Sequence, residues 1–216
     1  EDKYEFWTFE RLGYQDDRIK KINSIEDFPK DIDPLHLVIL FEKEKPLIKS
    51  KDLPLFGIDD SVFLQNSDFP GLMTKKEIRV QILAEINLPK EGIIWDIGSG
   101  VGSIGLEALR ICPNLKLLSV DKRIGSKTII EENSRRLGVN PSLIIEDEVL
   151  NVFKKNKIAD KLSRPDRVII GGGGSNLYSI IEEVLKKING YSILIIPLIS
   201  LKSISKLESI LKPKVN

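Results

Sequence analysis

From Thr74 onward, the chain alternates between short apolar segments and amphipathic ones. The apolar segments are GIIWDI, LKLLSV, SLIIE, RVIIGG and YSILIIPLI, and helical patterns precede, separate and follow them. Strands that are apolar throughout are buried on both faces, and helical connections let neighbouring strands run parallel. The pattern predicts an α/β fold with a doubly wound, mostly parallel sheet that is covered by helices on both faces.

The first 70 residues follow a different pattern. The segments YEFWTFERLG and LHLVILFEKEK predict two strands, with a polar helical or turn segment near DDRIKKI between them. Two strands cannot bury a core of ordinary size. We therefore expect residues 1–50 to be a partial α/β segment, the proline-spaced residues 51–70 to be a linker, and residues 71–216 to form the main domain.

The composition limits the kinds of partner. The 33 basic and 32 acidic side chains give a formal net charge of +1, which argues against a nucleic-acid surface and against a polybasic membrane anchor. The apolar run at 191–199 is far shorter than the roughly 20 residues of a membrane-spanning helix. We expect no signal peptide and a cytoplasmic protein. Its partner should be a small molecule or a protein, and a homo-oligomer is left open.

The cysteine and histidine content predicts no chemistry. The single cysteine, Cys112, rules out a disulfide within these 216 residues and suits a reducing compartment. It precedes Pro113 at the end of a predicted helix, where a structural role is favoured. His36 lies in an apolar strand pattern without a second histidine or a cysteine nearby, so we expect no metal site.

The segment WDIGSGVGSIGLE, residues 95–107, is rich in glycine and lies between a predicted strand and a predicted helix. Gly100, Gly102 and Gly105 fit the pattern GxGxxG, and Asp121 follows about twenty residues later, as a dinucleotide site requires. The same segment also fits D-x-G-x-G-x-G beginning at Asp96, a pattern associated with S-adenosylmethionine sites. Glycine spacing alone does not separate these two interpretations.

Acidic residues at the predicted strand ends favour S-adenosylmethionine. An aspartate beside a diphosphate would repel it, whereas S-adenosylmethionine carries an ammonium, a sulfonium and a ribose diol. Asp96 suits the cationic methionine end, Asp121 can accept hydrogen bonds from both ribose hydroxyls, and Asp147 is placed for the adenine amino group. The alternative is that the glycines only tighten a packing turn and that the aspartates cap helices.

Several longer motifs together resemble one enzyme family. The segments PGLMTKKEIRVQIL, WDIGSGVGSIGLEA, PDRVIIGGGGSNL and FGIDDSVF resemble the precorrin-6Y methyltransferases of cobalamin biosynthesis. Residues 68–216 resemble the decarboxylating domain, which in that family methylates carbon 15 of the tetrapyrrole and removes the carboxyl group of a ring acetate. The segments FERLGYQDDRIKKI and LHLVILF resemble the end of the tetrapyrrole methylase domain, which acts at carbon 5.

The resemblance implies a Rossmann-like, class I S-adenosylmethionine-dependent fold and assigns roles to individual residues. Thr74 matches a cofactor-contacting threonine, and the segment 147–148 matches the adenine side, although Glu148 and Glu146 replace residues that are usually small. The predicted cofactor contacts are Thr74, Asp96, Gly98, Ser99, Gly100, Val101, Gly102, Asp121, Asp147 and Glu148.

The substrate side is predicted from two further features. Gly171 and Gly172 directly follow a strand, where the absence of side chains leaves room for a tetrapyrrole carbon to approach the methyl group. Lys75 and Arg79 lie at the start of the first helix and could receive substrate carboxylates, although a solvated helix turn explains them equally well. No residue is assigned as a general base, because an electron-rich tetrapyrrole carbon can attack directly.

Thr74 also has a structural interpretation. It precedes a helical pattern with Ile78, Ile82 and Ile86 on one face, and Glu77 follows three residues later, which is a capping-box pattern. A capping role and a cofactor contact are compatible.

The sequence therefore predicts an S-adenosylmethionine-dependent C-methyltransferase that acts on a precorrin with decarboxylation. Alignment and exclusion of water are what such a transfer requires of the protein. Two alternatives are a cofactor-binding or assembly module without turnover and, less favoured, an NAD-dependent oxidoreductase.

Overall fold

The computed structural model describes residues 4–42, 49–65, 73–172, 174–198 and 207. The chain divides into two compact units, Glu1–Leu47 and Ile48–Asn216. No helix among the described residues is long and apolar enough to cross a membrane. The helical pattern that follows the last apolar segment, LKSISKLESIL at residues 201–211, lies outside the described residues, apart from Leu207.

The first unit is a three-stranded antiparallel sheet of order β2-β1-β3. Its strands are β1 (Tyr4–Glu10), β2 (Arg18–Ile22) and β3 (His36–Glu42), and a short 3-10 turn covers Ile25–Asp27. Of the helical or turn segment expected near DDRIKKI, the turn is present over residues 11–16, whereas Arg18–Ile22 is a strand that pairs along β1. Cross-strand pairing outweighs the polar composition of that segment, and the described part of this unit has β character rather than the expected α/β character.

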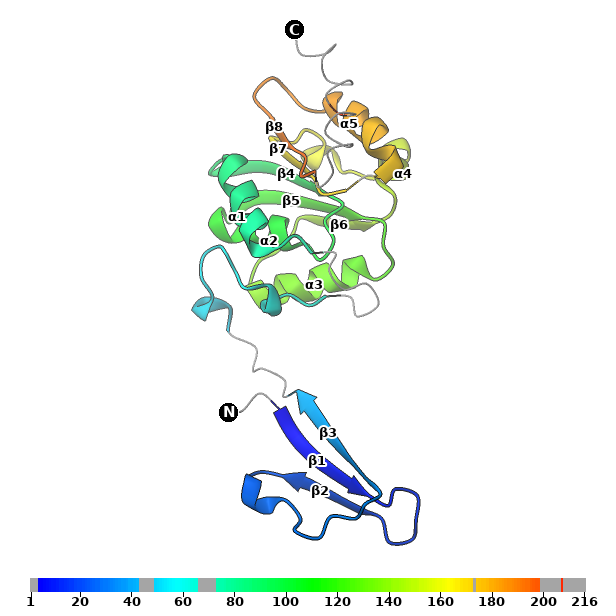
Figure 1. Ribbon diagram of the computed structural model, residues 1–216. Helices are drawn as coiled ribbons and strands as arrows, with labels where there is room; N and C mark the ends of the chain where they lie inside the picture. The colour runs from blue at the N-terminus through cyan, green and yellow to red at the C-terminus, as the bar shows by residue number, and fades with distance from the viewer. Residues whose placement is uncertain (1–3, 43–48, 66–72, 173, 199–206, 208–216) are drawn as a thin grey trace. The chain divides into compact units, whose positions relative to one another are not determined.

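The second unit contains a five-stranded sheet of order β6-β5-β4-β7-β8, and every neighbouring pair is parallel (Figure 1). The strands are β4 (Glu91–Ile97), β5 (Asn114–Asp121), β6 (Leu143–Glu146), β7 (Arg167–Ile170) and β8 (Ile193–Ile195). These are the five apolar segments of the sequence, so the predicted parallel sheet is confirmed. The first strand, β4, is at the centre, and the chain extends the sheet to either side of it.

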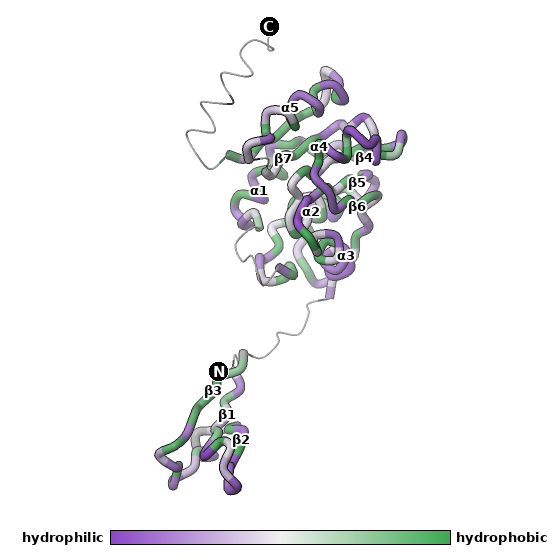
Figure 2. Tube along the Cα trace, turned by 90° about the vertical axis from the view of Figure 1, so that its right-hand side faces the viewer, coloured by the Kyte–Doolittle hydropathy of each residue, from purple (hydrophilic) through white to green (hydrophobic). Residues whose placement is uncertain are grey.

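Helices cover both faces of this sheet. They are α1 (Lys76–Glu85), α2 (Ser103–Ile111), α3 (Ser126–Leu137), α4 (Val149–Lys154) and α5 (Leu177–Leu185). Buried residues of α1, α2 and α3 form one hydrophobic cluster with the sheet, and those of α4 and α5 form a second cluster on the opposite face. Hydrophobic residues concentrate along the central strands (Figure 2). Burial on both faces explains why the strands are apolar throughout.

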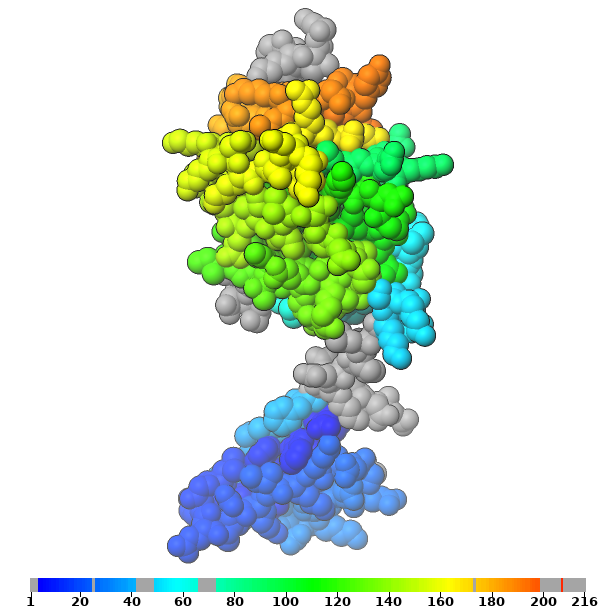
Figure 3. Space-filling view, turned by 180° about the vertical axis from the view of Figure 1, so that it is seen from behind, coloured from blue at the N-terminus to red at the C-terminus, as the bar shows by residue number. Residues whose placement is uncertain are grey.

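The segment 49–65 differs from the expected linker. Leu53, Ile58 and Phe63 are buried within the cluster that α1, α2 and α3 form. Ser50 donates a 2.6 Å hydrogen bond to the carbonyl of Leu137, and the side chain of Asn133 exchanges hydrogen bonds with the backbone of Leu64. Figure 3 shows the segment in cyan against the green surface of the following residues. Residues 49–65 are therefore a packed part of the second unit.

The first helix also differs in detail from its prediction. Its N-cap residue is Lys75, without a side-chain capping bond, so the capping box predicted at Thr74 is wrong. Ile82 and Ile86 are buried as expected, but Ile78 is half exposed and Arg79 is buried instead. Arg79 thus takes the place expected for Ile78 on the buried face, where its charge is paired with Glu107 and Asp60.

Candidate functional site

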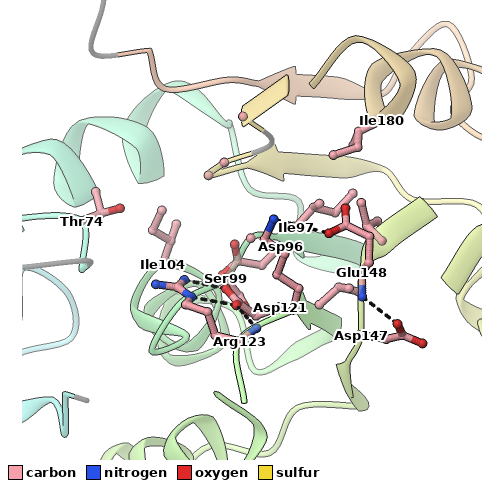
Figure 4. A pocket seen from close by; sticks show the side chains of 17 residues that line it. Thr74, Asp96, Ile97, Ser99, Ile104, Asp121, Arg123, Asp147, Glu148 and Ile180 are labelled. Carbon is pink, nitrogen blue, oxygen red and sulfur yellow. Dashed lines mark hydrogen bonds and ion pairs between the residues drawn. The ribbon is translucent and has the colours of Figure 1, made fainter. Parts of the chain in front are cut away.

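A cavity of about 310 Å³ lies at the carboxyl ends of the central strands (Figure 4). It opens where the chain order of the sheet reverses around β4, which is the usual ligand position in open α/β sheets. Its lining residues are Thr74, Asp96, Ile97, Gly98, Ser99, Ile104, Val120, Asp121, Lys122, Arg123, Asp147, Glu148, Val149, Gly171, Gly172, Gly174 and Ile180.

The structure brings most of the predicted site residues together around this cavity. Those that line it are Thr74, Asp96, Gly98, Ser99, Asp121, Asp147, Glu148, Gly171 and Gly172. Those that do not are Gly100, Val101, Gly102, Lys75 and Arg79. The second half of the glycine loop and the two basic residues of the first helix therefore lie outside the wall of the cavity.

Close backbone packing explains the glycines at the ends of β4 and β7. A Cβ atom on Gly98 would lie 3.0 Å from the amide nitrogen of Gly172, and one on Gly171 would lie 3.0 Å from the carbonyl oxygen of Gly98. Gly98 also has a φ of +71°, which disfavours any side chain. By contrast, a Cβ on Gly172 would meet no described atom within 4 Å. The floor of the cavity is thus tight between the strands and open above Gly172.

Gly100, Gly102 and Gly105 shape the loop after β4 and its packing. Gly100 has a φ of +62°, and its N–H donates a 2.7 Å hydrogen bond to Oδ2 of Asp121. A Cβ on Gly102 would lie 3.1 Å from the side chain of Ile130 in α3. Gly105 packs its helix on β5, since a Cβ there would lie 2.8 Å from Leu117. Gly102 also has a φ of +79°, so it combines a positive φ with close packing.

Asp96 is a buried carboxyl group at the floor of the cavity. It is 1% exposed, and its Oδ2 accepts a 3.1 Å hydrogen bond from the N–H of Gly105. Burial raises the pKa of Asp96 to about 7, and the neighbouring charge of Asp121 adds to this rise. A cation bound beside Asp96 would favour its ionised form.

Asp121 has the opposite electrostatic character. Burial disfavours its charged form, but hydrogen bonds from the side chain and backbone of Arg123 and from the N–H of Gly100 outweigh that effect and lower its pKa. Arg123 Nε lies 2.8 Å from Oδ1, and Nη2 lies 2.6 Å from Oδ2. Asp121 is therefore a fixed negative charge at the end of β5.

The side chains of Asp147 and Glu148, the two acidic residues after β6, point in different directions. The Asp147 carboxylate accepts hydrogen bonds from Lys157 at 2.7 Å and from the N–H of Glu148 at 2.8 Å, and these bonds lower its pKa. Figure 4 shows the Asp147 side chain pointing away from the other labelled residues, whereas Glu148 points toward Ile97 and Ile180. Glu148 also lies 3.5 Å from Lys122. Glu148 is thus the better placed acceptor on this side.

Arg79 is engaged in the interior, which corrects its predicted role toward substrate. Its side chain is fully buried, with Nε 2.8 Å from Glu107 and Nη1 2.8 Å from both Asp60 and the carbonyl of Thr74. Its Nη2 donates to the carbonyl of Ile58. A buried arginine with four acceptors is not available to substrate carboxylates.

Lys75 is exposed and lies outside the cavity lining, with its Nζ 3.6 Å from Oδ2 of Asp60.

Among the described residues, no group of histidine, cysteine, aspartate and glutamate side chains could hold a metal ion.

A comparison with protein-family models identifies the family of this chain. The model described as "Precorrin methyltransferase domain" matches residues 66–213. The chain belongs to this precorrin methyltransferase domain family. The match covers β4 to β8 and all the residues that line the cavity.

Two curated relatives show the extent of the similarity. A Pyrobaculum aerophilum protein named "Probable cobalt-precorrin-6B C(15)-methyltransferase (decarboxylating)" is 31% identical over 150 residues, which are 68% of this chain and 72% of the relative. A Sinorhizobium "Precorrin-6Y C(5,15)-methyltransferase [decarboxylating]" is 32% identical over 124 residues, 57% of this chain but only 28% of that protein.

A solved structure supports the same fold. The crystal structure of precorrin-6Y C5,15-methyltransferase from Geobacter metallireducens has a TM-score of 0.64 and 27% identity, covering 74% of this chain and 81% of that chain. The Rossmann-like methyltransferase fold predicted from the sequence is thereby confirmed, and this family and fold imply the use of S-adenosylmethionine.

The cavity of this precorrin methyltransferase domain has features that fit S-adenosylmethionine. The Ser99 hydroxyl is buried and has no hydrogen-bond partner among the described residues, although it lines the cavity. Buried polar groups ordinarily have partners, so a hydroxyl without one suits a polar ligand. The space above Gly172 is open, and the carboxyl groups of Asp96 and Asp121 make the floor polar, which suits a cationic ligand with a ribose.

Sequence reasoning missed several lining residues of the domain. They are Ile97, Ile104, Val120, Lys122, Arg123, Val149, Gly174 and Ile180. The apolar members belong to strands and helices whose hydrophobicity is explained by the core, so no separate signal distinguishes them. Lys122 and Arg123 directly follow Asp121, so their position next to a predicted cofactor contact could have indicated that they line the cavity.

Proposed function

We propose that this protein uses S-adenosylmethionine to methylate carbon 15 of a precorrin, with loss of a carboxyl group from the same substrate. The names of its relatives support the substrate and the decarboxylation. The domain match supports the methyl transfer.

One observation carries the proposal: the cavity at the carboxyl ends of the strands is lined by side chains that suit the cofactor's polar groups. Asp96 lies where an ammonium would be favoured, and Ser99 offers a hydroxyl that lacks a described partner. Asp121 presents a carboxylate to the ribose side, and Glu148 presents one to the adenine side. A diphosphate would meet these same carboxylates with repulsion, which argues against an NAD-dependent oxidoreductase.

The mechanism assigns the protein a positioning role. When bound, S-adenosylmethionine supplies an electrophilic methyl group attached to a sulfonium. The packed turn at Gly98 and Gly171 fixes the cavity floor, and the open space above Gly172 leaves a path for the substrate carbon. Ile104 and Ile180 contribute apolar walls that help to exclude water. Holding the reacting groups in line is a large contribution in such transfers, and no general base is required.

Titration calorimetry with S-adenosylhomocysteine tests the cofactor assignment. We expect saturable binding of S-adenosylhomocysteine and no binding of NAD under the same conditions. Binding of NAD alone would refute the proposal.

Turnover separates an enzyme from a cofactor-binding or assembly module. With a precorrin substrate, we expect methyl incorporation and release of carbon dioxide in equal amounts, measured by mass spectrometry and by trapping of the gas. Cofactor binding without either product would favour the non-catalytic alternative.

The assignment of residues 1–50 to the end of a tetrapyrrole methylase domain remains a proposal. It is supported by the sequence resemblance, while the matched family domain begins at residue 66.

A further inference from the structure

The carboxylate of Asp121 already holds as many hydrogen bonds as it can readily accept. Oδ1 accepts from the backbone N–H and from Nε of Arg123, at 2.9 and 2.8 Å. Oδ2 accepts from the N–H of Gly100 and from Nη2 of Arg123, at 2.7 and 2.6 Å. An ionised carboxylate offers about four acceptor positions. The group therefore lacks a free position for a ribose hydroxyl.

Two of these four contacts come from a side chain that can move. The N–H donors of Gly100 and Arg123 belong to the backbone and are fixed by the loop. The Arg123 guanidinium is on a long side chain that is 34% exposed and lines the cavity, whereas the Asp121 side chain is only 2% exposed. Figure 4 shows the guanidinium beside Asp121 on the cavity side. Movement of Arg123 alone would free one position on each oxygen, the number that a ribose diol needs.

We propose that Arg123 is a latch on Asp121, which competes with the ribose of the cofactor and must swing aside when the cofactor binds. This inference rests on the proposed function, because it requires an adenosyl ligand in this cavity. The latch keeps the buried carboxylate paired when no ligand is present, which avoids the cost of an unpaired buried charge. It also makes cofactor affinity the difference between two competing sets of hydrogen bonds.

Removal of the latch has an unusual consequence. A side chain that contacts a ligand weakens binding when it is removed, whereas removal of a competitor strengthens binding. In Arg123→Met the alkyl stem is kept and the guanidinium is lost. We expect S-adenosylhomocysteine to bind roughly two- to fivefold more tightly to this variant, the scale of a partly exposed ion pair.

Arg135→Met is the matched control. Arg135 makes the same two-pronged contact with Glu132, with Nε at 2.9 Å and Nη2 at 2.8 Å, and neither residue lines the cavity. We expect wild-type affinity in this variant. Thermal melting of both variants, followed by calorimetry below the melting range, ensures that affinities are compared between folded proteins.

A second ligand pair tests whether the ribose is the competing group. We expect Arg123→Met to tighten the binding of adenosine by the same factor as that of S-adenosylhomocysteine, and to leave the affinity of 2′,3′-dideoxyadenosine unchanged. Unchanged or weaker binding of S-adenosylhomocysteine by Arg123→Met would overturn the latch. An equal gain for dideoxyadenosine would also overturn it, because the competition would then not involve the hydroxyls.

These outcomes are separable from failure of the proposed function. If the wild-type protein and Arg123→Met both fail to bind S-adenosylhomocysteine, the cofactor assignment itself is wrong and the latch falls with it. If the wild-type protein binds this ligand and Arg123→Met binds it no more tightly, only the latch is refuted.

Discussion

At the scale of single residues, Asp96 couples stability to pH. Its pKa is raised to about 7 by burial, from a reference value of 3.8. The folded state therefore holds the proton more tightly than the unfolded state, and the contribution of Asp96 to the free energy of unfolding decreases as pH rises from about 4 to about 7.

The variant Asp96→Asn cannot titrate at this position. We expect the free energy of unfolding of the wild-type protein, relative to Asp96→Asn, to be lower near pH 8 than near pH 5. Urea denaturation of both proteins at the two pH values measures this difference. A constant difference would show that the Asp96 carboxyl ionises as it does in the unfolded chain.

Gly100 requires a different expectation from the one that the motif alone suggests. If this glycine lay against the cofactor, alanine would reduce affinity and leave stability unchanged. The structure places Gly100 outside the cavity lining, with a φ of +62° and its N–H bound to Asp121. We expect Gly100→Ala to lower the free energy of unfolding by about 1 kcal/mol, from the positive φ.

Gly57→Ala is the comparison for this change. Gly57 has a φ of +70°, and a Cβ atom there would make an ordinary 3.4 Å contact with Val80. Its loss of stability should be similar, while S-adenosylhomocysteine affinity should stay at the wild-type value. If Gly100→Ala lost affinity for S-adenosylhomocysteine without a fall in melting temperature, the result would show that Gly100 contacts the cofactor directly.

At the scale of elements, the strands were more predictable than the segments between them. Each strand of the second unit is apolar because both its faces are covered, and this leaves a clear signal in the sequence. The packing of residues 49–65 left no such signal, because the buried Leu53, Ile58 and Phe63 follow neither a strand nor a helix period, and the equally apolar Leu55 and Phe56 between them are exposed. The burial of Arg79 could not be predicted from the sequence either, because its partners Glu107 and Asp60 are distant from it in sequence.

This buried ionic network should stabilise the attachment of residues 57–60 to the helices. Glu107 accepts hydrogen bonds from Arg79, from the N–H of Gly57 at 2.9 Å and from the N–H of Ile58 at 3.2 Å. Glu107→Gln removes the charge and places an amide donor among these donors. We expect the free energy of unfolding to fall by about 3 kcal/mol, because the arginine loses a buried counterion.

Urea denaturation measures this change, and Glu131→Gln is the control, because it removes the charge of an exposed glutamate. Glu131 lies 3.9 Å from Lys127 and is 54% exposed, so its change should be below about 0.5 kcal/mol. Equal effects of the two substitutions would mean that the segment is held by its apolar side chains alone.

At the scale of the whole molecule, all the described residues of the site belong to the second unit. Both hydrophobic clusters of the second unit consist of residues from Leu53 onward, and so does the described lining of the cavity. A protein of residues 48–216 should therefore bind S-adenosylhomocysteine with the affinity of the full chain, within a factor of about two. Calorimetry on both proteins measures this, and a larger loss would show that the first unit contributes to the site.

The first unit is expected to depend on other protein surface for its stability. In its antiparallel register, Phe6 and Leu40 share one face of the sheet, while Ile19, Leu37 and Phe41 belong to the other. All five are substantially exposed within the described structure. A three-stranded sheet needs at least one well-covered apolar face for independent stability. Residues 1–47 alone should therefore show no cooperative thermal transition by circular dichroism, and a sharp, reversible transition would show that this small sheet is a domain in its own right.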